Sequence, residues 1–422
     1  MNDLARLTAR RYYAGAAFQG VWTTGQYLFP FVLAKSLGAP AWLVTLSVMM
    51  ETSGMVLGLW WGPLVAGGHR RRTLFWGGLA GRVVLVAALL ATTPGRFVAL
   101  LGLVYLFVSL VYPAQNSILQ ENIPERRRGE VFGRGALIQH AVAAACSLVV
   151  GAQLDRDPMS YTWLFPVIGA LGFGYPLLLS TLPRPARPAG DVGAPAPSPA
   201  PPAARSLATA LWQPFRDARD TFRRDRAYLW YQLNFTLYGV AFIMLVPVVP
   251  LYFTSELALD YSAIAGARIL IGSLGVGLLG PLAGRLMDRL HPARLCALAF
   301  GWVALYPLTL AAGPWLDLSP AATAYAAFAV YSVGMAGVNI TWNVGSIAFA
   351  PPGRGGHYQG IHVAMVGVRG VLAPVLGYVM LEVAGYRAAF LAAAVLFVLA
   401  AGSSAALARR VARSGGGGQS PD

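Results

Sequence analysis

The chain is built from long apolar runs separated by short polar loops. Because a bilayer core about 30 Å thick is crossed by about 20 helical residues, runs of this length predict membrane-spanning helices. The first six predicted spans are Tyr12–Ser36, Ala41–Ala66, Leu74–Ala91, Phe97–Leu119, Val131–Leu154 and Tyr161–Leu182. The other six are Tyr228–Thr254, Ile264–Leu286, Leu295–Ala311, Ala321–Ala350, Tyr358–Leu381 and Arg387–Leu407. The pattern predicts an all-α polytopic membrane protein with about twelve spans.

Composition supports a lipid environment. Hydrophobic residues make up 56% of the chain and charged residues 12%, whereas soluble domains carry about 25% charged residues. The formal net charge is +15, but the basic residues form short clusters between apolar runs and no basic module with interleaved aromatic residues. We therefore expect membrane lipid as a partner and no nucleic acid.

The position of the basic clusters predicts the orientation. Arginines crowd the amino-terminal end, the carboxyl-terminal end, the central segment and every second loop between them. The remaining loops hold only Lys35, Arg96, Arg156 and Arg387. Since positive charge is retained on the cytoplasmic side, we expect a multi-pass protein of the cell inner (plasma) membrane with cytoplasmic N- and C-termini.

A polar interruption divides the chain into similar halves. It starts with a proline-rich stretch, typical of an extended tether, and ends with apolar residues at helical spacing between arginines, which indicates a helix on the membrane surface. The predicted parts are an N-terminal six-helix bundle (1–182), a cytoplasmic linker with an amphipathic helix (183–226), a C-terminal six-helix bundle (227–408) and a disordered tail (409–422).

The two halves share short sequence patterns. Gly-Pro-Leu at 62–64, before the second loop, recurs at 280–282, before the eighth. Ser-Ile at 117–118 and at 346–347 is in each case followed by proline, arginine and glycine. An internal repeat of six spans is typical of transporters whose substrate site lies between two bundles related by a pseudo-two-fold axis.

The most specific motif runs from Gly284 through Asp288 and Arg289 to Arg294. It resembles the Gly-x-x-x-Asp-Arg/Lys-x-Gly-Arg-Arg loop of the major facilitator superfamily. The resemblance implies the fold of that superfamily, with this loop at the cytoplasmic ends of paired helices. It also implies that Asp288 and Arg289 are gate residues and that Gly284 is a close-packing position.

The chain departs from the family pattern in several places. His291 replaces the second glycine of the motif, and the matching loop of the first half has Ala66 where the family has the acidic residue. The Gly-Pro signature that drug/proton antiporters carry in their fifth span is missing from Val131–Leu154. A standard drug/proton antiporter is therefore disfavoured.

Ionisable residues inside spans are costly, at about 2.5–3.5 kcal/mol in mid-helix, so each needs a reason. Glu51 lies near the middle of the second span and suits a proton carrier or a cation-facing site. The alternative is a structural acid that is paired with Arg82 or hydrogen-bonded between helices. Arg82, Arg268 and Arg369 have two interpretations: they neutralise Glu51, or they bind an anionic substrate. For Arg82 and Arg268, a third interpretation is that they lie close enough to helix ends to reach the membrane surface.

Two histidines are further proton-coupling candidates. His140 and His362 lie in the fifth and eleventh spans, and imidazole can relay protons near neutral pH; the alternative is a packing or hydrogen-bonding role. Neither histidine has a second ligand at metal spacing, and Cys146 and Cys296 form no metal-binding pattern. We expect no metal and no cofactor.

Neutral polar residues of the first, seventh and tenth spans are candidates for lining a substrate cavity, with hydrogen bonding between helices as the alternative. Trp342 and the deep Arg369 join them. The full set of cavity candidates is Gln19, Gln26, Gln232, Asn234, Asn339, Trp342, Asn343 and Arg369.

The sequence thus predicts a secondary active transporter, acting as a monomer, that moves a small organic solute by alternating access. Proton-coupled efflux of a moderately hydrophobic solute is the first hypothesis, because the expected cavity mixes aromatic and amide groups with few charges. Uptake of a small metabolite is the second, and a non-transporting sensor or scaffold is an alternative of another class. No enzyme motif is present in the sequence.

Overall fold

The computed structural model describes residues 3–66, 70–183, 207–351 and 354–415, and every regular element within these ranges is a helix. The first half contains α1 (Asp3–Phe31), η1 (Val32–Ser36), α2 (Ala41–Ala66), α3 (Arg70–Val83), η2 (Val84–Leu90), α4 (Pro94–Asn122), α5 (Glu125–Arg156), η3 (Pro158–Ser160), α6 (Tyr161–Gly172) and α7 (Gly174–Ser180). The chain continues with α8 (Leu207–Arg224), α9 (Arg226–Leu251), η4 (Tyr252–Glu256), α10 (Tyr261–Ala265), η5 (Gly266–Ser273), α11 (Leu274–Arg289), α12 (Pro292–Val303), α13 (Leu305–Ala312), η6 (Gly313–Trp315), α14 (Pro320–Ile340), η7 (Thr341–Gly345), η8 (Ile347–Phe349) and α15 (Gly355–Gly415).

Helices occupy all twelve predicted segments. Within the described residues, nine helical stretches are long and apolar enough to cross a membrane. One of them, His357–Arg413, contains two of the predicted spans. Its helix breaks at Gly385, whose φ of +79° lies in the left-handed region that favours glycine. The polytopic helical fold is therefore confirmed, while α1 and α2 are helices that do not belong to the nine.

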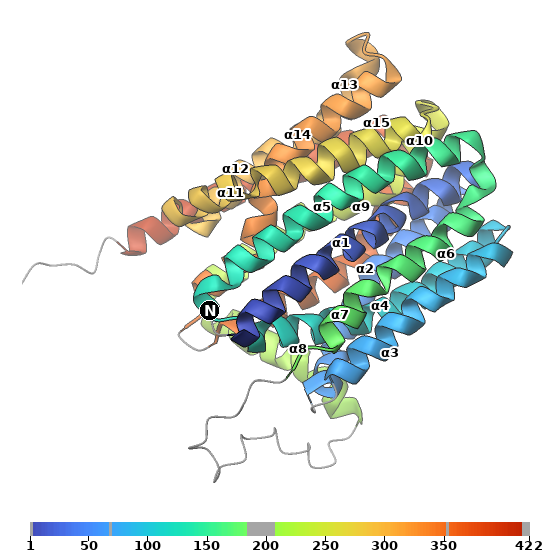
Figure 1. Ribbon diagram of the computed structural model, residues 1–422. Helices are drawn as coiled ribbons and strands as arrows, with labels where there is room; N and C mark the ends of the chain where they lie inside the picture. Colours follow the sequence, from blue (N-terminus) through green and yellow to red (C-terminus); the bar gives the residue numbers. More distant parts are fainter. Residues whose placement is uncertain (1–2, 67–69, 184–206, 352–353, 416–422) are drawn as a thin grey trace, which may run out of the picture.

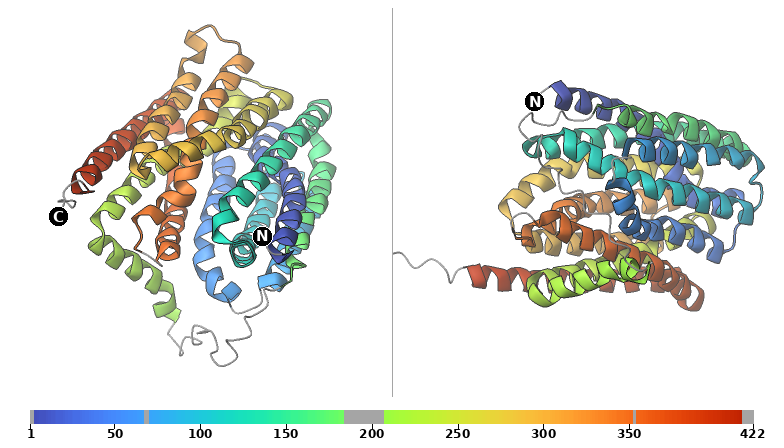
Figure 2. Two further views of the ribbon diagram at one scale, coloured as in Figure 1. Left: turned by 60° about the vertical axis from the view of Figure 1, so that its left-hand side comes forward. Right: turned by 90° about the horizontal axis from the view of Figure 1, so that it is seen from below.

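The helices form two bundles (Figure 2). In the first half α1 packs on α5, α6 and α7, and α3 and α4 pack together; in the second half α15 packs on α9 and α12, and α14 on α11 and α12. The bundles meet where α2 contacts α15 and where α5 contacts α10, η5 and α11. The start of α1 and the last turns of α15 lie at the same end of the molecule (Figure 1), which we call the arginine-rich end. The opposite end, with loops 37–40, 157 and 257–260, is the far end.

A structural repeat links the two halves at the far end. In each half the first long helix ends in a π-helical turn, at Val32–Ser36 and at Tyr252–Glu256. The backbone hydrogen bonds match as well: the amides of Leu37 and Leu257 donate to the first residue of each turn. The residue that follows has positive φ in both cases, at +58° in Gly38 and +48° in Ala258. These two far-end turns, residues 32–39 and 252–259, support the internal repeat that the sequence predicts.

Helix α8 lies within the predicted linker and is attached to the second half. The hydroxyl of Thr221 lies 2.9 Å from Nε2 of His357, and the Phe222 ring packs 5.8 Å from that of Tyr228. Its described arginines are exposed. This arrangement fits a helix with one polar face. The proline-rich tether falls in 184–206 and so lies outside the described residues, and the division into domains stays a prediction. The predicted disordered tail, 409–422, is wrong for residues 409–415, because α15 continues through them to Gly415; residues 416–422 lie outside the described residues.

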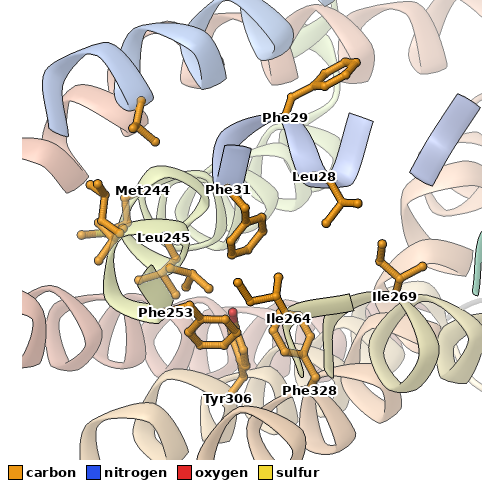
Figure 3. Packing of buried hydrophobic residues seen from close by; sticks show 14 of the residues in the cluster. Leu28, Phe29, Phe31, Met244, Leu245, Phe253, Ile264, Ile269, Tyr306 and Phe328 are labelled. Carbon is orange, nitrogen blue, oxygen red and sulfur yellow. The ribbon is translucent and has the colours of Figure 1, made fainter. Parts of the chain in front are cut away.

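The buried core continues from one half to the other near the far end. Figure 3 shows Phe31 of the first half pointing toward Phe253 and Ile264 of the second. The Phe31 and Phe253 rings lie 6.2 Å apart, and all three side chains are fully buried. Apolar side chains thus pack across the contact between the halves next to the two far-end turns.

Candidate functional site

A cavity of about 320 Å³ lies between the two halves. That volume is at the small end of the range of about 300–1,000 Å³ in which ligand pockets fall. Side chains of α1, α2 and α5 line it from the first half, and side chains of α9, η5, α11, α14, η7 and α15 from the second. The lining residues are Tyr27, Thr52, His140, Tyr238, Gly239, Phe242, Ile243, Arg268, Ser273, Val276, Phe328, Tyr331, Met335, Val338, Asn339, Trp342, Val366 and Arg369.

Arg369 of α15 is the most deeply buried charge of this cavity, with 4% of its surface exposed. One guanidinium nitrogen donates to the Phe235 carbonyl at 2.5 Å. Its Nε is buried without a hydrogen-bond partner among the described residues. The guanidinium fits against α9 only because Gly239 has no side chain, since a Cβ there would overlap Arg369 Nε.

Arg268 of η5 is the second cation in the lining, and it is half-buried. Its guanidinium carbon lies 5.2 Å from the centre of the Tyr27 ring and 5.7 Å from that of Phe31. These rings belong to the first half, so Arg268 makes cation–π contacts across the interface. The structure therefore encloses Arg268 between the halves and does not place it at the membrane surface.

Stacked rings form one wall of the cavity. Tyr238 and Phe242, one turn apart in α9, have nearly parallel rings 5.9 Å apart, and Phe242 is stacked on Tyr331 of α14 at 6.3 Å. All three line the cavity. Such a wall offers flat apolar surface to a bound solute.

His140 also lines the cavity, where it links the halves. Its Nδ1 lies 2.7 Å from the hydroxyl of Ser273 in η5. The other two proton-coupling candidates lie outside the lining. Glu51 accepts a hydrogen bond from the Tyr105 hydroxyl at 3.5 Å and interacts electrostatically with Arg268. His362 is fully buried, with Nδ1 3.0 Å from Oε1 of Gln232.

Three of the eight predicted cavity residues are in the cavity lining, and the other five, Asn343 among them, are not. Asn339, Trp342 and Arg369 line the cavity, and Asn343 donates to Asn339 within the same helical segment at 2.9 Å.

The remaining four lie elsewhere. The buried Gln232 contacts His362, as described above, and Asn234 is also buried, with 1% of its surface exposed. Gln19 lies 3.5 Å from a guanidinium nitrogen of Arg82, and Gln26 is half-buried. The Arg82 guanidinium stacks over Trp22 at 4.4 Å with only 2% of its surface exposed. A pairing of Glu51 with Arg82 is thus replaced by the interaction with Arg268.

Sequence reasoning missed the aromatic walls. Tyr238 and Phe242 stand at i and i+4, and Phe328 and Tyr331 at i and i+3, so each pair shares a helix face. That spacing was the available signal, but apolar spans are rich in such pairs. It does not tell which pair faces the other half.

The predicted gate motif is open to solvent in this conformation. Asp288, Arg289 and Arg294 have exposed side chains. Apart from its own helix backbone, none of the described atoms lies within 4 Å of the position of a Cβ on Gly284. Among the described residues nothing packs closely on Gly284 in this conformation, and its role as a close-packing position stays a prediction.

At the far end, by contrast, polar contacts hold the halves together. The carboxylate of Asp155, at the end of α5, accepts from the amides of Tyr261 (2.6 Å) and Ser262 (2.9 Å) and from the Ser262 hydroxyl (2.5 Å). Lys35 donates to the Leu259 carbonyl at 2.5 Å. The hydroxyls of Ser36 and Tyr261 lie 2.6 Å apart. We call these contacts of residues 35, 36 and 155 with residues 259, 261 and 262 the far-end latch.

Comparison with known proteins identifies the family. The model of the family described as Major Facilitator Superfamily matches residues 13–370. The chain belongs to the Major Facilitator Superfamily. No curated protein matches the chain.

Solved structures of superfamily transporters share the fold over nearly the whole chain. The nucleoside transporter NupG superimposes with a TM-score of 0.68 at 15% identity, covering 96% of this chain and 100% of its own. A POT family transporter in complex with 5-aminolevulinic acid gives 0.70 at 11% identity, with 97% and 96% covered. A D-xylose-proton symporter gives 0.64 at 15% identity, with 95% of each chain covered. At such identities the likeness shows the fold alone, so substrate and coupling must be argued from this chain's own residues.

Proposed function

We propose that the chain is a secondary active transporter that carries a small organic solute through the central cavity by alternating access. The observation that carries this proposal is the cavity itself, which lies between the two bundles and takes side chains from both. A site shared by two related bundles becomes accessible from either side when the bundles rock against each other. A sensor or scaffold would need no such solute-sized space.

The contacts between the halves support a defined step of this cycle. The hydrogen bonds of the far-end latch lie at the far end. Two further hydrogen bonds between the halves lie at the level of the cavity: Thr52 donates to the Gly370 carbonyl at 2.7 Å, and His140 contacts Ser273 as described above. The gate motif at the arginine-rich end is exposed. We assign this conformation to the state that opens toward the arginine-rich end, and Asp288 and Arg289 to contacts that form when that end closes.

The orientation of the arginine clusters gives this state its direction. With the arginine-rich end in the cytoplasm of a cell bounded by an inner membrane, the conformation is inward-open. Fusions of a reporter to each terminus test this: both reporters are expected to be cytoplasmic. Termini in different compartments would overturn the orientation.

Proton coupling is proposed for Glu51. It lies within α2, beside the Tyr105 hydroxyl and within electrostatic reach of Arg268 from the other half. A proton on Glu51 removes its attraction for Arg268, so protonation changes how strongly the two halves interact. His140 and His362 stay secondary candidates, since each already contacts a neutral polar side chain.

The coupling test uses the protein in liposomes under an imposed pH gradient. Glu51→Gln is expected to abolish accumulation driven by the gradient while exchange of solute across the membrane persists. Glu382→Gln is the matched control, because Glu382 is exposed on α15. Gradient-driven accumulation by Glu51→Gln at the control rate would exclude the role.

Efflux is the favoured direction because aromatic and aliphatic side chains make up most of the cavity lining, which suits solutes that cross membranes into the cell by themselves. Uptake of a small metabolite is the second candidate. The observation that favours it is the pair of arginines in the lining, since polar metabolites need charged partners.

Counterflow provides the direct test of transport. Liposomes preloaded with unlabelled solutes that are anionic, neutral or cationic should exchange at least one of them with labelled solute outside, in a saturable manner. The proposal would be overturned by two results together. These are no exchange of any of the three solute classes, and cysteines introduced into the cavity lining that thiol reagents never reach from one face of the membrane.

A further inference from the structure

The charges around the cavity are unbalanced. Its described lining contains two arginines and neither aspartate nor glutamate. Within the described residues, neither Arg268 nor Arg369 forms an ion pair with a nitrogen–oxygen distance of 4.0 Å or less. A buried cation without an ion-pair partner is costly, so the arrangement favours a ligand that supplies the missing negative charge.

Arg369 is oriented to make such a contact. It lines the cavity while being 96% buried by the protein, because only 4% of its surface is exposed. The Phe235 carbonyl takes one of its donors, and Nε remains without a described partner. Arginine presents its donors in a planar fork that matches the two oxygens of a carboxylate.

Arg268 adds a second positive charge on the same cavity. Its cation–π contacts with Tyr27 and Phe31 hold the guanidinium at the interface without neutralising it. Glu51 interacts with it electrostatically but does not line the cavity. Arg268, Arg369 and the Glu51 carboxylate together carry a net charge of +1, which a ligand with a single negative charge would balance.

The walls indicate what the rest of the solute looks like. Tyr238, Phe242 and Tyr331 present stacked rings, and Phe328 and Trp342 add further aromatic surface to the lining. Flat apolar groups fit between such rings, and the cavity volume of about 320 Å³ restricts the solute to a small one.

We propose that the transported solute is a small, flat organic monoanion, such as an aromatic carboxylate, whose charged group lies between Arg369 and Arg268 and whose body packs against the aromatic wall. The proposal rests on the transport function proposed above and names its substrate class. It holds for either direction of transport.

The test compares three probes of nearly equal size that differ in charge: benzoate, benzamide and benzamidinium. Equilibrium binding of radiolabelled benzoate to the purified full-length chain is measured, with the other two as competitors. Benzoate is expected to bind saturably, and the neutral and cationic probes to compete at least tenfold more weakly. Cyclohexanecarboxylate, which has the charge but lacks the flat ring, should also bind more weakly than benzoate.

Variants locate the site. Arg369→Gln and Arg268→Gln are each expected to lower benzoate affinity at least tenfold, and Arg369→Lys to lower it less than Arg369→Gln. Arg387→Gln is the matched control: Arg387 also makes a cation–π contact, 3.8 Å from the Trp315 ring, but does not line the cavity. If Arg369→Gln fails to fold, Arg268→Gln and the comparison of benzoate, benzamide and benzamidinium on the unaltered chain still test the anion site.

Each outcome bears on one proposal. Equal binding of benzamide or benzamidinium, no saturable benzoate binding, or an equal loss in Arg387→Gln would overturn the anion site. Counterflow of a cationic or neutral solute without benzoate binding would leave transport intact and overturn only the substrate class. Benzoate binding that needs both arginines but produces no counterflow would keep the anion site and overturn transport.

Discussion

The far-end latch contains a helix cap supplied by the opposite half. The first amides of a helix have no partner within it, and Asp260, which precedes α10, forms no side-chain cap hydrogen bond. Asp155 of α5 takes over this role by accepting from the amides of Tyr261 and Ser262 and from the Ser262 hydroxyl. These bonds exist only while the halves are in contact at this end, so Asp155→Ala should favour opening there.

The size of the effect follows from the contacts. Loss of a side-chain cap costs about 0.5–2 kcal/mol, and an ordinary hydrogen bond such as that of the Ser262 hydroxyl adds about 0.5–1.5 kcal/mol. Asp155 is exposed, and water compensates for part of the loss, so we expect about 1–2 kcal/mol in total. At 1.4 kcal/mol per factor of ten, the equilibrium shifts about 5- to 30-fold toward the state that is open at the far end.

Distance measurements by electron spin resonance detect this shift. Spin labels on Leu90 of the first half and Leu316 of the second, both exposed, report opening as a growing long-distance population. Asp157→Ala is the matched control. Asp157 also accepts an amide hydrogen bond near the far end, from Met159 at 2.9 Å, but within its own half. If Asp155→Ala changed the populations no more than Asp157→Ala, the cap between the halves would contribute nothing to closure.

Two glycines give further predictions. Gly370→Ala should disfavour the present conformation by about 1–3 kcal/mol, because its Cβ would lie 2.8 Å from Thr52 Cβ and 3.0 Å from the Thr52 carbonyl carbon. The same spin-label distances check this prediction, with Gly284→Ala as the control that should leave them unchanged. A distance distribution in Gly370→Ala that is also unchanged would refute it. Gly239→Ala should leave the melting temperature nearly unchanged, because only the flexible side chain of Arg369 must move, yet weaken benzoate binding at least tenfold. Unaltered affinity would show that the position of this guanidinium does not matter.

The membrane fold could be predicted from the sequence because the length and order of the apolar runs are enough to predict it. Apolar length specifies a helix that crosses lipid, and all twelve predicted segments are helical. The repeat was harder to see. Of the far-end turns, only Leu37 and Leu257 keep the same residue at equivalent positions, while Gly38 corresponds to Ala258 and Ala39 to Leu259. What the turns share is a backbone conformation, which different residues can adopt.

The candidate site was predicted in part, for a reason that particular residues illustrate. Depth in a span singled out Arg369, and the structure places it in the cavity. Polarity within a span favoured Gln232, which instead contacts His362 within the second half. Arg268 lies near a helix end in the sequence, but Tyr27 of the other half covers it. Helical spacing tells which residues share a face, whereas the rotation of each helix and the docking of the halves decide which face meets the cavity.

That docking also joins the latch to the cavity. Arg268 follows Tyr261 by about two helical turns in a continuous helical stretch that runs from α10 through η5. When Asp155 releases Tyr261, a movement of this stretch away from the first half must also separate Arg268 from Tyr27 and Phe31. An anion on Arg268 would therefore meet a different set of neighbours in each state. A ligand shifts an equilibrium only by its differential affinity for the two states. If the proposed anion site is occupied, this change of neighbours would be the physical means by which solute binding and opening at the far end influence each other.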